Sequence, residues 1–125
     1  MPRRPSATLT DAEVRLMNIL WIKGRATVAN VVEALTGKPT LAYNTVLTMM
    51  RILERKGYVA HDKLGRAFVY RPVVDRVDAR RHALRHLAHR LFDDSPGLLV
   101  LSVMKDENLD GAELRRLKEL IDTSE

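Results

Sequence analysis

Cysteine is absent from the 125 residues, which excludes a disulfide framework and a thiolate metal site. Long apolar runs are also missing, since the run at residues 98–101 is far too short to span a bilayer. Residues 1–5 are basic, as at the start of a signal peptide, but no apolar segment follows them. These absences predict a cytoplasmic protein without membrane insertion and without a cofactor.

Signatures of catalysis are lacking too. The sequence contains no glycine-rich phosphate-binding loop, and no hydroxyl residue has a neighbouring base in a recognisable triad arrangement. The histidines lack the spacing and the glutamate of a metalloprotease helix. The sequence therefore indicates a protein that is not an enzyme.

Positive charge is abundant and unevenly distributed. The formal net charge is +5 and the sequence pI is about 9.9. Residues 1–72 hold 12 Lys/Arg against 5 Asp/Glu, whereas residues 73–125 hold 9 against 11. Only the first part has the excess that attracts phosphate. We therefore expect two regions, a nucleic-acid-binding domain at 1–72 and a region with another role at 73–125.

Residues 40–57 predict a helix with one buried face. Val46, Met50 and Leu53 are spaced by four and three residues, which makes an apolar stripe. Small polar residues and arginines occupy the other sides. Short side chains let a helix approach base edges, an asparagine can pair with adenine, and arginine can pair with guanine or phosphate. An ordinary solvated helix face is the alternative for this segment taken alone.

The residues after Gly57 predict a β-hairpin with a basic tip. Strands are expected at 58–62 and 67–72, joined by a turn that contains Lys63 and Arg66. Upstream, residues 10–13 fit a capping box that opens a helix at 11–22, and Thr27 can cap the next helix. This order of elements predicts a mainly α fold with a small β-hairpin, a winged helix-turn-helix. The expected core contains Trp21, Val32, Met50, Leu53 and Val59.

The predicted DNA contacts divide between the helix and the hairpin. Base reading is expected from the polar helix face, sugar or thymine-methyl contact from its edge, and phosphate or minor-groove contact from the hairpin tip and the start of the helix. A protein that packs DNA without reading sequence would show mainly lysine and arginine instead. The candidate DNA-binding residues are Thr40, Tyr43, Asn44, Thr45, Thr48, Arg51, Arg55, Lys63 and Arg66.

Residues 73–125 predict three helices that begin after Asp75, at Ser95-Pro96 and after Asp110. So many apolar side chains in a short segment need a partner, and a second copy of the same helices would provide it. Packing back onto the first domain is the alternative. The candidate dimerisation residues are Leu84, Leu91, Leu98, Leu101, Leu114, Leu117 and Ile121.

Three histidines follow helical spacing in the first of these helices. His82, His86 and His89 lie at i, i+4 and i+7, on one stripe that could hold zinc or nickel. No acidic residue is expected on that face, and Arg85 and Arg90 flank it. We therefore expect no metal site, with a metal-responsive repressor as an alternative function.

Six segments of the sequence together carry a resemblance to a known family: residues 9–13, 19–21, 42–46, 53–57, 65–72 and 92–96. In these segments the sequence resembles the penicillinase repressor (BlaI/MecI) family, which includes the copper repressor CopY. This resemblance implies a dimeric winged-helix transcriptional repressor on a palindromic operator, released when a membrane-embedded metalloprotease sensor signals. The family's cleavage site is an Asn-Phe bond, and Ser102-Val103 stands at the corresponding place. The lack of cysteine removes the copper sensing of the CopY branch.

Overall fold

The structure is a computed structural model that describes residues 8–35, 37, 40–108 and 110–123. It divides into two compact units, residues 1–83 and residues 84–125, which we call the winged-helix unit and the C-terminal unit. The units divide within a helix, later in the chain than the boundary expected at residue 72. The assignment of DNA binding to 1–72 and of dimerisation to 73–125 stays a prediction.

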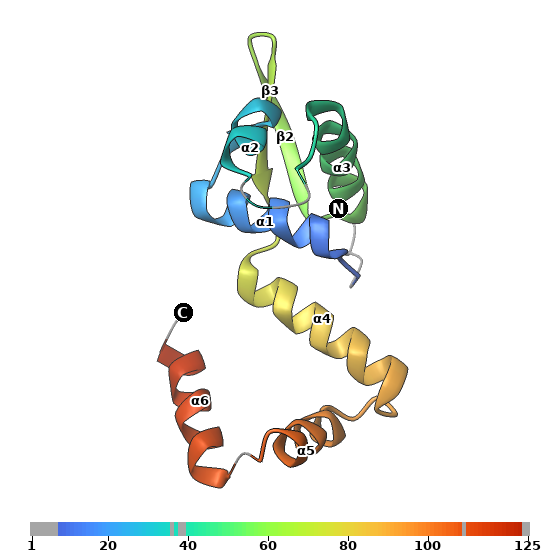
Figure 1. The fold of residues 1–125 in the computed structure, drawn as a ribbon, viewed down its shortest axis with the longest axis vertical. Coiled ribbons are helices and arrows are strands. Elements are labelled where there is room, and N and C mark those ends of the chain that lie inside the picture. Colours follow the sequence, from blue (N-terminus) through green and yellow to red (C-terminus); the bar gives the residue numbers. More distant parts are fainter. Residues whose placement is uncertain (1–7, 36, 38–39, 109, 124–125) are drawn as a thin grey trace. The chain divides into compact units, whose positions relative to one another are not determined.

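The winged-helix unit contains the predicted helices and hairpin (Figure 1). The first helix begins after a capping box, in which Glu13 N–H donates to Thr10 Oγ1 (3.1 Å) and Thr10 N–H donates to Glu13 Oε1 (2.8 Å). Thr27 caps the second helix by accepting from Asn30 N–H (3.1 Å). The elements are α1 (Asp11–Lys23), β1 (Ala26–Thr27), α2 (Val28–Ala34), α3 (Tyr43–Lys56), β2 (Val59–Leu64) and β3 (Ala67–Pro72).

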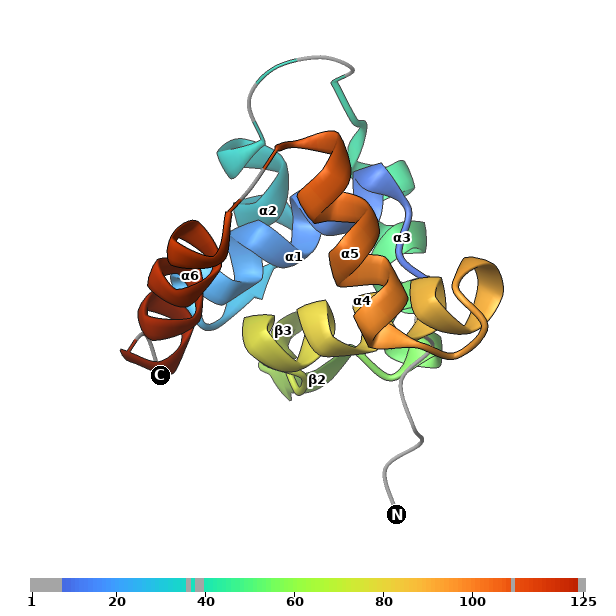
Figure 2. The ribbon, with the colours of Figure 1, turned by 90° about the horizontal axis from the view of Figure 1, so that it is seen from below.

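A short third strand completes the sheet. The strand order is β1-β3-β2 and both pairings are antiparallel, with Ala26 opposite Tyr70 and Val59 opposite Pro72. Sequence reasoning did not predict β1, because two residues are too few to show an alternation of apolar and polar side chains. The strand forms because the chain between α1 and α2 lies beside β3. Figure 2 shows α1 between α2 and α3 in the view from below.

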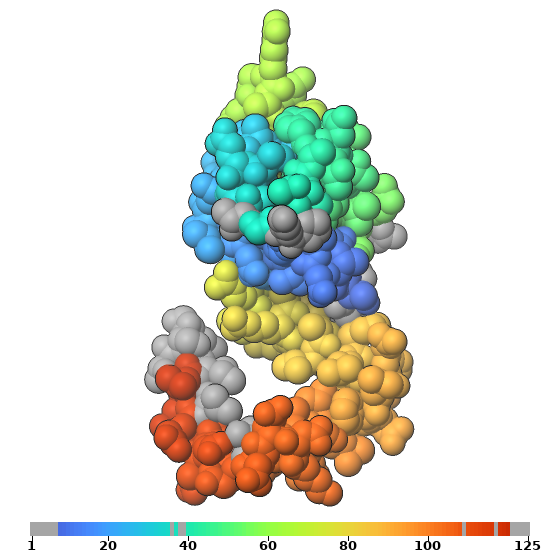
Figure 3. Space-filling model, in the orientation of Figure 1, coloured from blue at the N-terminus to red at the C-terminus, as the bar shows by residue number. Residues whose placement is uncertain are grey.

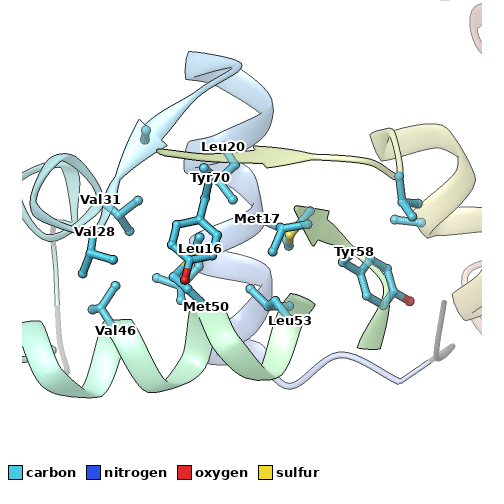
Figure 4. Packing of buried hydrophobic residues seen from close by; sticks show 14 residues of the cluster. Leu16, Met17, Leu20, Val28, Val31, Val46, Met50, Leu53, Tyr58 and Tyr70 are labelled. Carbon is cyan, nitrogen blue, oxygen red and sulfur yellow. The ribbon is translucent and has the colours of Figure 1, made fainter. Parts of the chain in front are cut away.

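The core lies between the three helices and the sheet (Figure 4). Val46, Met50 and Leu53 of α3 are fully buried, as their spacing predicted, and Val59 is buried as well. Trp21 and Val32, also expected in the core, are only partly buried and pack against it. The remaining fully buried side chains come from α1, from α2, from the bend before β2 and from β3: Leu16, Met17, Leu20, Val31, Tyr58 and Tyr70.

Trp21 lies at the edge of the core because its indole contacts the chain that follows the sheet. Its Nε1–H donates to the carbonyl oxygen of Val74 (2.9 Å). The guanidinium carbon of Arg76, the first residue of α4 (Arg76–Leu91), lies 5.3 Å from the centroid of the indole ring. These two contacts fix the start of α4 on α1 within the winged-helix unit.

A partly buried ion pair joins the start of α1 to the end of α3. Lys56 Nζ lies 2.7 Å from Glu13 Oε1 and also donates to the carbonyl oxygen of Thr8 (3.1 Å). Burial raises the pKa of Glu13, but the hydrogen bonds from Lys56 and Thr10, together with the positive charge of Lys56, lower it below its ordinary value of 4.5 overall. The ionised carboxylate therefore stabilises the fold.

Lys56→Met is expected to lower the free energy of unfolding by about 2 kcal/mol at neutral pH, because it leaves a buried carboxylate without its partner. Since the pKa of Glu13 is lowered in the folded protein, its contribution is present above pH 4.5 and is lost as the pH falls through the folded value. When the pH is lowered from 7 to 3, the free energy of unfolding should therefore fall less in the variant than in the unmodified chain. Urea unfolding between pH 3 and 7 measures both effects, with exposed Lys63→Met as control. Equal stability of the two variants would contradict the role of this ion pair.

The C-terminal unit contains the rest of α4 with α5 (Pro96–Asp106) and α6 (Gly111–Thr123). The predicted helix starts are confirmed: Asp75, Ser95 and Asp110 each accept a hydrogen bond from a backbone N–H three residues later, at 2.7, 3.1 and 2.8 Å. Within the described part of the chain, α4, α5 and α6 pack very little on one another. None of these helices is both long and apolar enough to cross a membrane.

Apolar side chains of the C-terminal unit are mostly exposed. Ala88 is its one buried hydrophobic residue among those described, and α5 has no buried residue. Leu114 is half-buried, whereas the side chains of Leu117 and Ile121 lie outside the described part of the structure. The exposed large apolar side chains of this unit are Leu84, Leu87, Leu91, Leu98, Val100, Leu101, Val103 and Leu120.

Candidate nucleic-acid interface

One stripe of α3 is polar and exposed. Asn44, Thr48, Arg51 and Arg55 follow i, i+4, i+7 and i+11, so they lie along one side of the helix. All four are exposed, and the buried stripe that contains Met50 lies on the opposite side. The helix thus has the two faces that its sequence predicted. Thr45 and Tyr43 are exposed on either side of the polar stripe.

The hydroxyl of Thr48 is already engaged within the helix. It donates to the carbonyl oxygen of Asn44 (3.0 Å), so its oxygen remains available as an acceptor. A base contact by Thr48 in this rotamer would therefore use a donor on the base, such as the amino group of adenine or cytosine. The side chain would contribute to base reading as an acceptor beside Asn44.

Helix α3 begins at Tyr43, and the expectation that it begins at Thr40 is wrong. Ala42 is the N-cap, in an extended conformation, and Val46 N–H donates to its carbonyl oxygen (3.0 Å). Leu41 packs against the core from the extended segment before the helix, which keeps Thr40 outside the first turn. Among the residues that the structure describes, no side chain caps α3. The backbone N–H groups at its start therefore belong to residues 43–45, and a phosphate contact by Thr40 stays a prediction.

The hairpin forms a wing, defined here as β2, β3 and the turn between them. Leu64 pairs with Ala67, so Gly65 and Arg66 make a two-residue turn. Gly65 has a φ of +62°, which a type II′ hairpin turn requires at this position and which glycine adopts without strain. Lys63 and Arg66 are exposed at the tip. Figure 3 shows this tip projecting beyond the surface of α2 and α3.

The base of the wing is tied to its surroundings by polar contacts. Asp62 Oδ2 lies 3.2 Å from Arg71 Nε and 3.4 Å from Nη2 of Arg25, in the segment before β1. His61 Nδ1 lies 2.6 Å from Glu54 Oε1 on α3. Two basic residues thus share one carboxylate at the base, whereas Arg66 forms no ion pair with another described residue. The contacts hold the wing beside α3 and leave the charge of its tip available.

A groove separates α3 from the wing. Its cavity volume is about 580 Å³, and the start of α2 closes one side. Sequence reasoning gave no role to Leu47, Leu64 or Phe68, which line it together with two predicted DNA-binding arginines. Apolar residues on the wing were the available signal, but only the fold brings them beside α3. The lining residues are Thr27, Val28, Ala29, Tyr43, Leu47, Arg51, Leu64, Arg66, Ala67 and Phe68.

The histidine stripe on α4 has an acidic neighbour, contrary to expectation. His89 Nδ1 lies 2.6 Å from Asp94 Oδ1, because the chain turns back after α4 and Asp94 N–H donates to the carbonyl oxygen of Ala88 (3.0 Å). Asp93 and Asp94 both adopt positive φ in this turn. Within the described residues, no three side chains of His, Cys, Asp or Glu come together as metal ligands. Neither His82 nor His86 therefore forms such a group with His89 and Asp94.

The candidate cleavage site lies inside a helix. Ser102 and Val103 belong to α5, where Val103 is exposed and Ser102 is half-buried. A protease acts on locally unfolded chain, so cleavage there would require α5 to unwind.

Comparison with known proteins places the chain in one family. The sequence profile described as penicillinase repressor matches residues 9–123. The chain is 27% identical to the penicillinase repressor of Bacillus licheniformis, over 91% of this chain and 89% of that protein. It is 39% identical to the transcriptional regulator BlaI of Mycobacterium tuberculosis, over 73% of this chain and 79% of that protein.

A solved structure agrees with the fold of the first unit. The solution structure of the DNA-binding domain of the repressor BlaI matches with a TM-score of 0.53 and 32% identity, over 61% of this chain and 93% of that domain. The resemblance seen in the sequence is confirmed, and so is the winged-helix fold. The chain therefore belongs to the penicillinase repressor family, the BlaI/MecI family of DNA-binding transcriptional repressors.

Proposed function

We propose that the protein is a sequence-specific repressor that binds a palindromic DNA operator as a homodimer. The observation that carries this proposal is the polar stripe of α3, directly opposite a fully buried stripe and beside a wing with a basic tip. Asn44 and Arg51 can pair with base edges in the major groove, and Lys63 and Arg66 can reach phosphate or the adjacent minor groove. A protein that only packs DNA has no need for the amide and hydroxyls of this stripe.

The homodimer is supported by α5. Leu98, Leu101 and Val103 are exposed, and apolar residues surround this helix on all sides. A helix that is apolar all round is stable in water only when other helices cover it, and the described residues of the C-terminal unit do not cover this one. A second copy would cover it and would also pair two winged-helix units. Such a pair has two-fold symmetry, which a palindromic operator matches.

Selection of duplexes from a random DNA library tests the proposal. We expect a two-fold symmetric consensus whose half-sites lie one or more helical turns apart, because each recognition helix must enter a major groove on the same side of the duplex. Mapping bound sites across the genome should return the same consensus. Recovery of unrelated sequences with equal affinity would favour DNA packing and would contradict a sequence-specific repressor.

We further propose that release acts through α5, through a membrane metalloprotease sensor pathway as the family resemblance implies. Cleavage between Ser102 and Val103 would cut the helix on which the proposed dimer interface depends, and would thereby end the simultaneous grip on two half-sites. Mass spectrometry of the repressor after induction should detect a fragment that ends at Ser102. The finding of intact chains alone on a derepressed operator would contradict release by proteolysis.

A further inference from the structure

The proposed function, on which this inference rests, constrains where a DNA strand must pass. If α3 lies in the major groove and the tip of the wing reaches the adjacent minor groove, one sugar-phosphate strand separates them. That strand has to cross the molecule between α3 and the wing. The groove of about 580 Å³ lies at this place, because its lining residues come from α3, from the start of α2 and from the two wing strands.

The lining of the groove combines arginine with apolar side chains. Arg51 lines the groove from α3, on the stripe proposed to read bases, and Arg66 lines it from the tip of the wing. The rest of the lining is mainly apolar, with Leu47 on α3 and with Leu64 and Phe68 on the wing. A nucleotide presents a base edge, an apolar sugar face and a phosphate, and arginine and apolar side chains are the groups that can contact these three parts.

Large apolar side chains in the lining of the groove are exposed to solvent. Leu64 is 57% exposed, Tyr43 52% and Phe68 40%, and all three line this one groove. Large apolar side chains that gather on a surface mark a contact with a partner. The two arginines in the lining favour an anionic partner, which agrees with a DNA strand and disfavours an apolar peptide.

We propose that this groove holds the sugar-phosphate strand between the major and minor grooves, with deoxyribose rings packed against Leu64 and Phe68 and a phosphate bound by Arg66. Burial of these side chains adds binding free energy that depends neither on base sequence nor on salt. The groove therefore strengthens binding to operator and to random DNA alike. It complements the polar stripe of α3, which distinguishes the two.

The test is Leu64→Ala in the full chain, measured on the selected operator and on a scrambled duplex at two salt concentrations. We expect affinity for both duplexes to fall about five- to tenfold, because apolar contact area is lost, with an unchanged salt dependence. Arg66→Ala should also weaken binding to both duplexes. In contrast to Leu64→Ala, it should reduce the slope of log affinity against log salt concentration by the amount expected for about one phosphate contact. Ile22→Ala shortens an exposed apolar side chain of α1 outside the groove, so it should change neither the affinity for the two duplexes nor the salt dependence.

Leu64→Asn keeps the size of the side chain and removes its apolar character, so it guards against a packing defect in the smaller variant. Thermal unfolding of each variant confirms that the wing is folded. Unchanged affinity in both Leu64 variants, a fall confined to the operator, or a changed salt dependence would each overturn the proposal. Asn44→Ala in the same titrations keeps the outcomes separate. It should weaken binding to the operator more than to the scrambled duplex, and an equal loss on both would refute the proposed function and not the groove.

Discussion

The double substitution Leu98→Asp and Leu101→Asp is expected to make the protein monomeric and to weaken operator binding by about a hundredfold or more. Both side chains are exposed on α5, so two carboxylates there cost the single chain little. In the proposed dimer the same charges would be buried without partners, which is strongly unfavourable. A monomer holds one half-site at a time and loses the gain from simultaneous binding. Sedimentation velocity and operator titration measure the two effects.

A matched control separates loss of the dimer from general damage. Ile22→Asp places the same charge on an exposed apolar position of the winged-helix unit, where it should leave both mass and affinity unchanged. Binding of the α5 variant to an isolated half-site should equal that of the unmodified chain. If the unmodified protein is already a monomer in solution, or if the α5 variant remains dimeric, the proposed interface is wrong.

Alanine at Asn44 or Arg51 should cost about 1 to 3 kcal/mol on the operator and much less on scrambled DNA. The reason is that a bidentate contact to a base edge is lost only where the correct base is present. Both side chains are exposed on α3, so the fold should not change. Competition titrations with the two duplexes measure the difference directly.

Arg66→Ala provides the contrast for this prediction. A phosphate contact is the same on every sequence, so this variant should lose similar affinity for both duplexes and show a weaker dependence on salt. The assignment of α3 as the recognition helix fails if Arg51→Ala also loses equal affinity for both.

Family and local structure could be predicted from the sequence because their causes are local. The capping box at Thr10 and Glu13 requires residues three positions apart, and the buried face of α3 requires only a repeat near 3.6 residues. Gly65 marks the turn of the wing for the same reason. Each of these signals lies within a few neighbouring residues, so it can be recognised without knowledge of the rest of the molecule.

Tertiary structure decided the features that join distant segments. Strand β1 exists because Ala26 and Thr27 lie beside β3, and α3 begins at Tyr43 because Leu41 is drawn to the core before it. The wing groove combines side chains from α2, α3 and both wing strands. No local pattern encodes such contacts, because they depend on how the helices and the sheet pack around one core. The sequence by itself therefore determined the winged helix and its polar stripe, and only the packed fold determined the groove beside that stripe.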